Sequence, residues 1–263
     1  MTDHSHHTGA PHDTEAEADT EVEVEVGPDA DADAEVDTVA GSVADAGAEA
    51  GLRGRWHDTL LAARAGAEGP DPLPYAENLL ARWAEPQRRY HSTAHLRAVL
   101  DHVDTLAAHA DDVQAVRLAA WFHDAVYRPD RSENEERSAA LAERALTEAG
   151  APDAVVAEVA RLVRLTVTHA PAEGDRNGEV LCDADLAVLA GGPQEYAAYA
   201  ARVREEYGFV PDDAFREGRA AVLRQLLDLP RLFRTPYGAA EWEERARHNL
   251  ATELELLTSS APG

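Results

Sequence analysis

The chain has 263 residues, 44% of them hydrophobic, and its 50 acidic and 24 basic residues give a formal net charge of −26. Nucleic acid and anionic lipid attract clustered Lys and Arg, so we expect neither as a partner and look instead for a small-molecule substrate. The single cysteine, Cys182, excludes an internal disulfide framework, and no apolar run approaches the roughly 18 residues that span a bilayer.

The first 51 residues are an acidic, low-complexity segment. They hold 15 of the acidic residues, no Arg and no aromatic residue, and four His residues lie near their start. Such a composition cannot bury enough apolar surface to offset chain entropy, so we predict a disordered tail over 1–51. The His residues read as part of a solvated tail or as loose transition-metal ligands. The segment lacks the apolar stretch of a signal peptide, so we expect a cytoplasmic protein.

Residues 52–258 are expected to form a single helical domain. Apolar residues recur there at spacings of three and four, Pro and Gly interrupt them, and no segment alternates as a strand does. The fold class predicted is all-α, a single bundle, with helices at about 52–65, 74–85, 93–110, 112–127, 133–149, 153–169, 179–190, 194–207, 212–228 and 239–257.

Two histidines, His91 and His95, lie at the start of the expected helix 93–110. His95 borders the apolar stripe of that helix, where its ring can point into the bundle. The next expected helix is apolar nearly all round, which is typical of burial on every side, yet it carries His123 and Asp124. Burying an unpaired carboxylate costs several kcal/mol, so the pair needs a cation or a hydrogen-bonded partner in the core.

Further candidates follow along the chain. Glu135 is either an acid or base in a cleft or the capping-box partner of Ser132. His169 ends the expected helix 153–169 and either lines the site or interacts with the helix dipole. Asp183 and Asp185 lie in another apolar helix, about 200° apart around its axis, so only one of them is expected to face the site.

Together these segments supply imidazoles and carboxylates from several helices, which are suitable ligands for a divalent metal. The order His95, then His123-Asp124, then Asp185 resembles the H…HD…D signature of the HD superfamily of metal-dependent phosphohydrolases. The resemblance covers most of residues 75–257. Further segments resemble a branch of predicted phosphohydrolases whose substrate is undefined; they are 89–95, 121–127, 133–135, 168–169, 183–186 and 245–250.

The resemblance implies an all-helical fold and one or two divalent ions, which can be Mn, Mg, Co, Ni, Fe or Zn. It favours His95 over His91 as the first ligand, because an apolar residue follows it, and Asp185 over Asp183 as the last. Asp183 is then an outer partner of the site or a solvated residue. The implied metal ligands are His95, His123, Asp124 and Asp185.

The implied catalytic residues are Asp124, Glu135 and His169. His91 and the forked guanidinium groups of Arg89 and Arg219 are candidates for binding a phosphorylated substrate.

The function implied is hydrolysis of a small phosphate ester through a metal-activated water, and the expected substrate is a nucleotide or nucleotide-like monoester or diester. Two alternatives share the fold. One is oxygen chemistry at two iron ions, for which His91 or His169 supplies an extra ligand. The other is a non-enzymatic module that binds a nucleotide or a metal.

Overall fold

The computed structural model describes residues 30–259, with side chains from residue 47 onward, and contains helices but no strand over this range. The chain divides into two compact units, Met1–Ala44 and Asp45–Gly263. Residues 30–51, which we expected to be disordered, form the first part of α1 (Ala30–Ala63). Ala and Glu are strong helix formers, which favours this local structure without a packed core. The rest of the predicted tail, residues 1–29, lies outside the described residues.

The helices of the second unit follow the predicted ranges closely, so the all-α class is confirmed. No helix in the described range combines the length and the apolar character that crossing a bilayer requires. The expected helix 239–257 is divided at Trp242. After α1 come α2 (Leu73–Trp83), α3 (Thr93–Leu106), α4 (Val113–Phe122), α5 (Asn134–Glu148), α6 (Asp153–Leu165), α7 (Arg176–Leu186), α8 (Pro193–Glu206), α9 (Asp212–Asp228), α10 (Pro236–Glu241) and α11 (Glu243–Ser259), with short 3-10 turns at Ala107–His109 and Ala187–Ala190.

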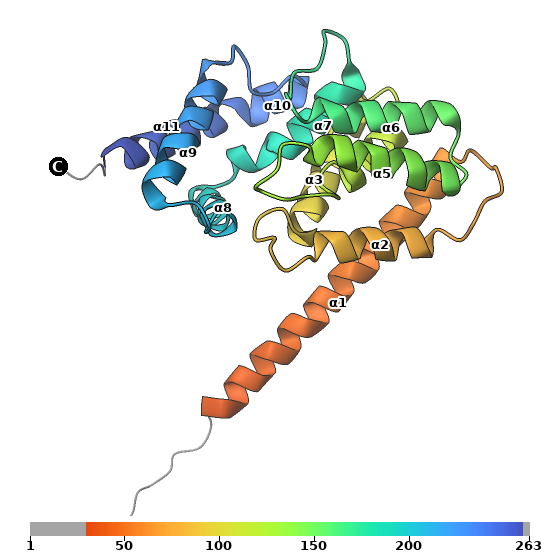
Figure 1. Cartoon of the computed structure of the whole chain (residues 1–263), viewed down its shortest axis with the longest axis horizontal. Coiled ribbons are helices and arrows are strands. Elements are labelled where there is room, and N and C mark those ends of the chain that lie inside the picture. The colour runs from red at the N-terminus through yellow and green to blue at the C-terminus, as the bar shows by residue number, and fades with distance from the viewer. Residues whose placement is uncertain (1–29, 260–263) are drawn as a thin grey trace, which may run out of the picture. The chain divides into compact units, whose positions relative to one another are not determined.

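The core is built around α4. Its last five residues are all fully buried, and it packs against α3, α5, α6 and α7. Two of these helices, α5 and α6, lie side by side (Figure 1). Trp56 of α1 places its ring edge-on to Trp121 and Phe122, with ring centroids 5.4 and 5.9 Å apart. Buried aromatic side chains of this size contribute most to core stability, and here they hold the C-terminal end of α4 in place.

The helix α4 ends at Phe122, five residues earlier than predicted, so His123 and Asp124 lie in the turn that follows and not in mid-helix. The buried guanidinium of Arg88 donates hydrogen bonds to the carbonyl oxygens of Asp124 and Ala125, at 2.8 and 3.3 Å. Because these carbonyls have a partner outside the helix, the apolar sequence can turn away from it.

The predicted capping box of Ser132 and Glu135 does not form. The residue that precedes α5 is Glu133, and no side chain caps this helix. Instead Asn134 exchanges hydrogen bonds with the backbone of Arg128, at 3.1 and 2.8 Å, and closes the loop before the helix.

Candidate metal centre

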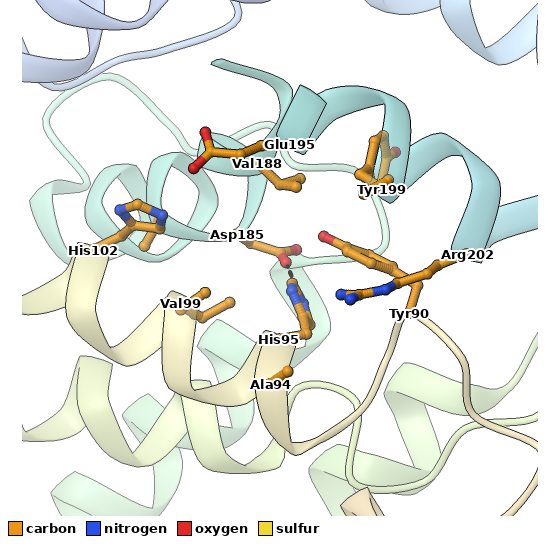
Figure 2. Close-up of a pocket in the computed structure, with 13 residues that line it drawn as sticks. Tyr90, Ala94, His95, Val99, His102, Asp185, Val188, Glu195, Tyr199 and Arg202 are labelled. Carbon is orange, nitrogen blue, oxygen red and sulfur yellow. Dashed lines mark ion pairs between the residues drawn. The ribbon is translucent and has the colours of Figure 1, made fainter. Parts of the chain in front are cut away.

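Three of the predicted ligands meet at one point. His95 comes from the first turn of α3, His123 follows α4, and Asp185 lies near the end of α7; one donor atom of each lies within 4.8 Å of the others. The Nε2 atoms of His95 and His123 are 3.1 and 3.6 Å from the same oxygen, Oδ1 of Asp185. Figure 2 shows the His95 ring directed at this carboxylate.

Both Nε2 atoms are buried, yet neither has a hydrogen-bond partner in the described part of the chain. The Nδ1 atom of His123 lies 2.8 Å from the carbonyl oxygen of Ala120, which can only accept a hydrogen bond. The N–H of a neutral His123 ring is therefore on Nδ1, and Nε2 presents a lone pair to the carboxylate. Two buried imidazole nitrogens that face one carboxylate oxygen, one of them with its lone pair toward that oxygen, form a donor set that fits a divalent cation.

The charges around His123 also favour a cation at this position. Burial lowers the pKa of His123, but Asp124 and Asp185 outweigh it and raise that pKa well above its ordinary value. Burial dominates at His95 and lowers its pKa. The two carboxylates therefore favour positive charge between them, as a proton on His123 or as a metal ion.

The fourth predicted ligand, Asp124, lies beside this group but outside the 4.8 Å set. Its Oδ2 atom is 3.3 Å from Nε2 of His123 and 3.8 Å from Nε2 of His91. Burial raises the pKa of Asp124, but the charges of His123 and His91 outweigh this and hold it below its usual range. Asp124 therefore faces the cluster as a carboxylate between two imidazole rings.

A third imidazole approaches Asp185 at its other oxygen. Nε2 of His169 lies 2.8 Å from Oδ2 of Asp185, the oxygen that the other two rings do not contact. The helix α6 ends at Leu165, earlier than expected, and His169 closes the following turn in the left-handed region with φ of 48°. This turn is what directs the ring back toward α7.

His91 is held in place by Glu206, which we did not predict. The Nδ1 atom of His91 lies 2.5 Å from the buried Glu206 carboxylate. The same carboxylate accepts hydrogen bonds from the hydroxyl of Tyr127 and from the backbone N–H groups of residues 89–91. Burial raises the pKa of Glu206, but the contacts with His91 and these donors outweigh it and bring it to about 2. Glu206 is 115 residues from His91 and lies in an Arg-Glu-Glu run that resembles any solvated helix, so the sequence contains no signal for it.

The other predicted residues lie outside the cluster. Arg89 is exposed and donates to the carbonyl of Pro86, and Arg219 forms two hydrogen bonds with Glu253, at 2.8 and 2.9 Å. Glu135 is in the first turn of α5, and no hydrogen bond or ion pair joins it to the cluster within residues 47–259.

Asp183 is fully buried, so it is not the solvated residue that we considered. It accepts hydrogen bonds from the backbone N–H groups of Arg234 and Thr235 and from the Thr235 hydroxyl, at 2.7 to 3.0 Å. These bonds fix the loop before α10 and point away from the cluster. Burial raises the pKa of Asp183 to about 6, against the lowering effect of the hydrogen bonds.

The cluster opens into a pocket of about 280 Å³ between α3, α7 and α8, which His95 and Asp185 help to line. Comparison of the chain with protein-family models, curated proteins and solved structures found no match. The residues of the cluster and its pocket are therefore the basis for inferring function.

Proposed function

We propose that this protein is a metal-dependent phosphohydrolase of the HD type, with a divalent ion held by His95, His123, Asp185 and Asp124. One observation supports the proposal above the others. Two buried Nε2 atoms, without hydrogen-bond partners in the described chain, face the same oxygen of Asp185. A purely structural His–Asp pair would place an N–H there, whereas the Nδ1 contact of His123 with a carbonyl leaves a lone pair in the neutral ring.

A divalent ion at this site would lower the pKa of water and offset the negative charge of a phosphoryl group. In the proposal, Asp124 orients the attacking water, since its carboxylate lies between two rings and is held ionised. His169 orients Asp185 through the 2.8 Å contact with Oδ2. His91 contacts the substrate through Nε2, because Glu206 fixes its Nδ1. The expected substrate is a small phosphate ester, nucleotide-like by the resemblance stated above.

A second candidate function, oxygen chemistry at two iron ions, is favoured by one specific feature. Each carboxylate of the cluster has an imidazole beside it that is not among the proposed ligands: His169 at Asp185 and His91 at Asp124. These rings provide the extra nitrogen ligands that a second ion needs. Iron retained through purification, together with no hydrolysis of any phosphate ester, would favour this function over the first.

Elemental analysis followed by an ester panel tests the proposal. The purified protein should contain a divalent metal, lose it and its activity to a chelator, and regain hydrolysis of phosphomonoesters or phosphodiesters when metal is added back. His95→Ala should purify without metal. The matched control is His109→Ala, since His109 also pairs with a carboxylate, Glu179 at 2.6 Å, but away from the cluster. Equal metal content in both variants, or no turnover by the metal-loaded parent, would contradict the proposal.

A further inference from the structure

The pocket beside the cluster is small, and both polar and aliphatic side chains line it. Its volume of about 280 Å³ is just below the range of roughly 300–1,000 Å³ that is usual for small-molecule sites. Metal-cluster residues form one side, and the aliphatic side chains of Val99 and Val188 form another (Figure 2). A ligand that fills it therefore combines one polar group with a short organic part.

Arg202 of α8 also lines this pocket, and it is the feature that the sequence analysis missed. Its guanidinium extends toward Tyr90 and the side of the pocket where His95 and Asp185 lie (Figure 2). Within residues 47–259 no carboxylate or carbonyl oxygen forms a hydrogen bond with it. Arg219, on the neighbouring helix, differs because Glu253 already occupies its fork. Arg202 is exposed at the rim of the pocket, and its five N–H donors and permanent positive charge are available to a ligand there.

We propose that Arg202 binds the phosphoryl group of the substrate in this pocket. The inference rests on the proposed function and deepens it by naming the group that anchors the substrate. A planar guanidinium donates two parallel hydrogen bonds to two oxygens of a phosphate, and its charge offsets the phosphate charge next to Asp185. The Tyr90 hydroxyl, which points into the same pocket, is a further donor.

The charge of the pocket also restricts the class of substrate. Arg202 is the one guanidinium among the lining residues, and two carboxylates, Asp185 and Glu195, accompany it. Glu195 accepts the backbone N–H of Gly192 at 2.8 Å and lies across the pocket from Arg202 (Figure 2). A second phosphate would approach this carboxylate, and no second guanidinium lines the pocket to offset the repulsion. The pocket therefore fits a monophosphate with a small, uncharged or donor-bearing organic part, and disfavours diphosphates and triphosphates.

Titration calorimetry with inorganic phosphate tests the assignment on the metal-loaded protein. Arg202→Gln should weaken phosphate binding by about tenfold or more, since a charge-assisted pair is lost. Arg202→Lys keeps the positive charge but loses the paired N–H donors of the guanidinium, so its phosphate affinity should lie between those of the parent and the Gln variant. Arg224→Gln is the matched control, because Arg224 is an exposed arginine of α9 away from the pocket, and its phosphate affinity should equal the parent's. Equal phosphate binding by Arg202→Gln and the parent would overturn the inference.

Pyrophosphate tests the charge restriction. The parent should bind it more weakly than phosphate, and Glu195→Gln should narrow that difference several-fold, because the repelling carboxylate is gone. Tighter binding of pyrophosphate by the parent would refute the monophosphate preference.

The failures of the two proposals have different signatures. If metal content and ester hydrolysis are normal but Arg202→Gln keeps the parent's KM and phosphate affinity, the Arg202 inference fails and the phosphohydrolase stands. If the protein holds no metal and turns over no ester, yet loses phosphate binding on Arg202→Gln, the proposed function fails and Arg202 remains an anion-binding residue.

Discussion

Asp183 and Asp185 are two residues apart on α7 and have opposite surroundings. Asp183 accepts hydrogen bonds from three donors, two N–H groups and one hydroxyl, and so its charge is satisfied within the fold. Asp185 faces three imidazole rings, and the Nε2 atoms of His95 and His123 have no hydrogen-bond partner in the described chain. A buried carboxylate among hydrogen-bond donors fixes a loop, whereas the one that faces two imidazole nitrogens without hydrogen-bond partners is where we propose a cation.

The largest expected effect separates these two carboxylates by metal content. Asp185→Ala removes a ligand and should lower metal affinity by more than about 100-fold, beyond the 10–100-fold typical of outer partners. Asp183→Ala should retain the parent's metal, because its carboxylate points toward Thr235 and not toward the cluster. Competition with a chromophoric chelator measures both. Metal loss in Asp183→Ala with retention in Asp185→Ala would reverse the assignment.

The free energy of unfolding should fall more in Asp183→Ala than in Asp185→Ala, the reverse of the order expected for metal affinity. In Asp183→Ala, the two buried donors of Thr235 and the part-buried N–H of Arg234 lose their acceptor, so stability should fall by about 2–4 kcal/mol. Asp185→Ala should cost less in metal-free protein, because no backbone donor depends on it. Urea unfolding of the metal-free variants gives both values. A smaller loss at Asp183 than at Asp185 would show that the loop before α10 does not need this carboxylate.

Glu206 is a third buried carboxylate, satisfied by donors as Asp183 is, and its role can be tested through the pH dependence of stability. Its folded pKa of about 2 is below the ordinary value of 4.5. A carboxylate with a lowered folded pKa stabilises the protein above its unfolded pKa, and this stability, about 3 kcal/mol, is lost as pH falls from 4.5 toward 2. Glu206→Gln should therefore be less stable than the parent at pH 7, and its free energy of unfolding should change less as the pH falls. Parallel acid dependence of variant and parent, measured by urea unfolding between pH 3 and 7, would contradict this role.

The smallest expected effect concerns Glu135, which the sequence offered as an acid or base. It has no hydrogen bond or ion pair to the cluster within the described residues, and it caps no helix. Glu135→Ala should therefore change metal content, kcat and KM by less than about twofold, as surface substitutions usually do. A loss of kcat well beyond twofold would place Glu135 in the reaction after all.

The sequence predicted the helices well because their apolar periodicity and their Pro and Gly breaks are local features. It also predicted three residues that the structure brings together, His95, His123 and Asp185. Their common feature is a polar side chain at the edge of an apolar stripe or just beyond it, which is costly unless the side chain meets a partner. That cost can be recognised from sequence even when the partner cannot.

Long-range hydrogen bonds explain what the sequence did not predict. The apolar pattern continues past Phe122, but the helix ends there. Arg88, 36 and 37 residues away in the sequence, donates hydrogen bonds to the carbonyl oxygens of Asp124 and Ala125 in the turn that follows. Glu206 and Arg202 lie on the predicted α8 among other charged residues, and only tertiary packing distinguishes the buried acid from the solvated ones. Sequence periodicity shows which face of a helix is buried, whereas the roles of Arg88, Glu206 and Arg202 depend on which distant segment packs against that face.

The left-handed backbone of His169 has an evolutionary consequence. A non-glycine residue in this region is strained by about 1 kcal/mol, a cost that Gly at the same position would avoid. Selection for thermal stability alone would therefore favour Gly here, whereas selection for the proposed function would keep the imidazole that lies 2.8 Å from Asp185. Under the proposed function, His169→Gly is thus expected to relieve backbone strain at the cost of activity.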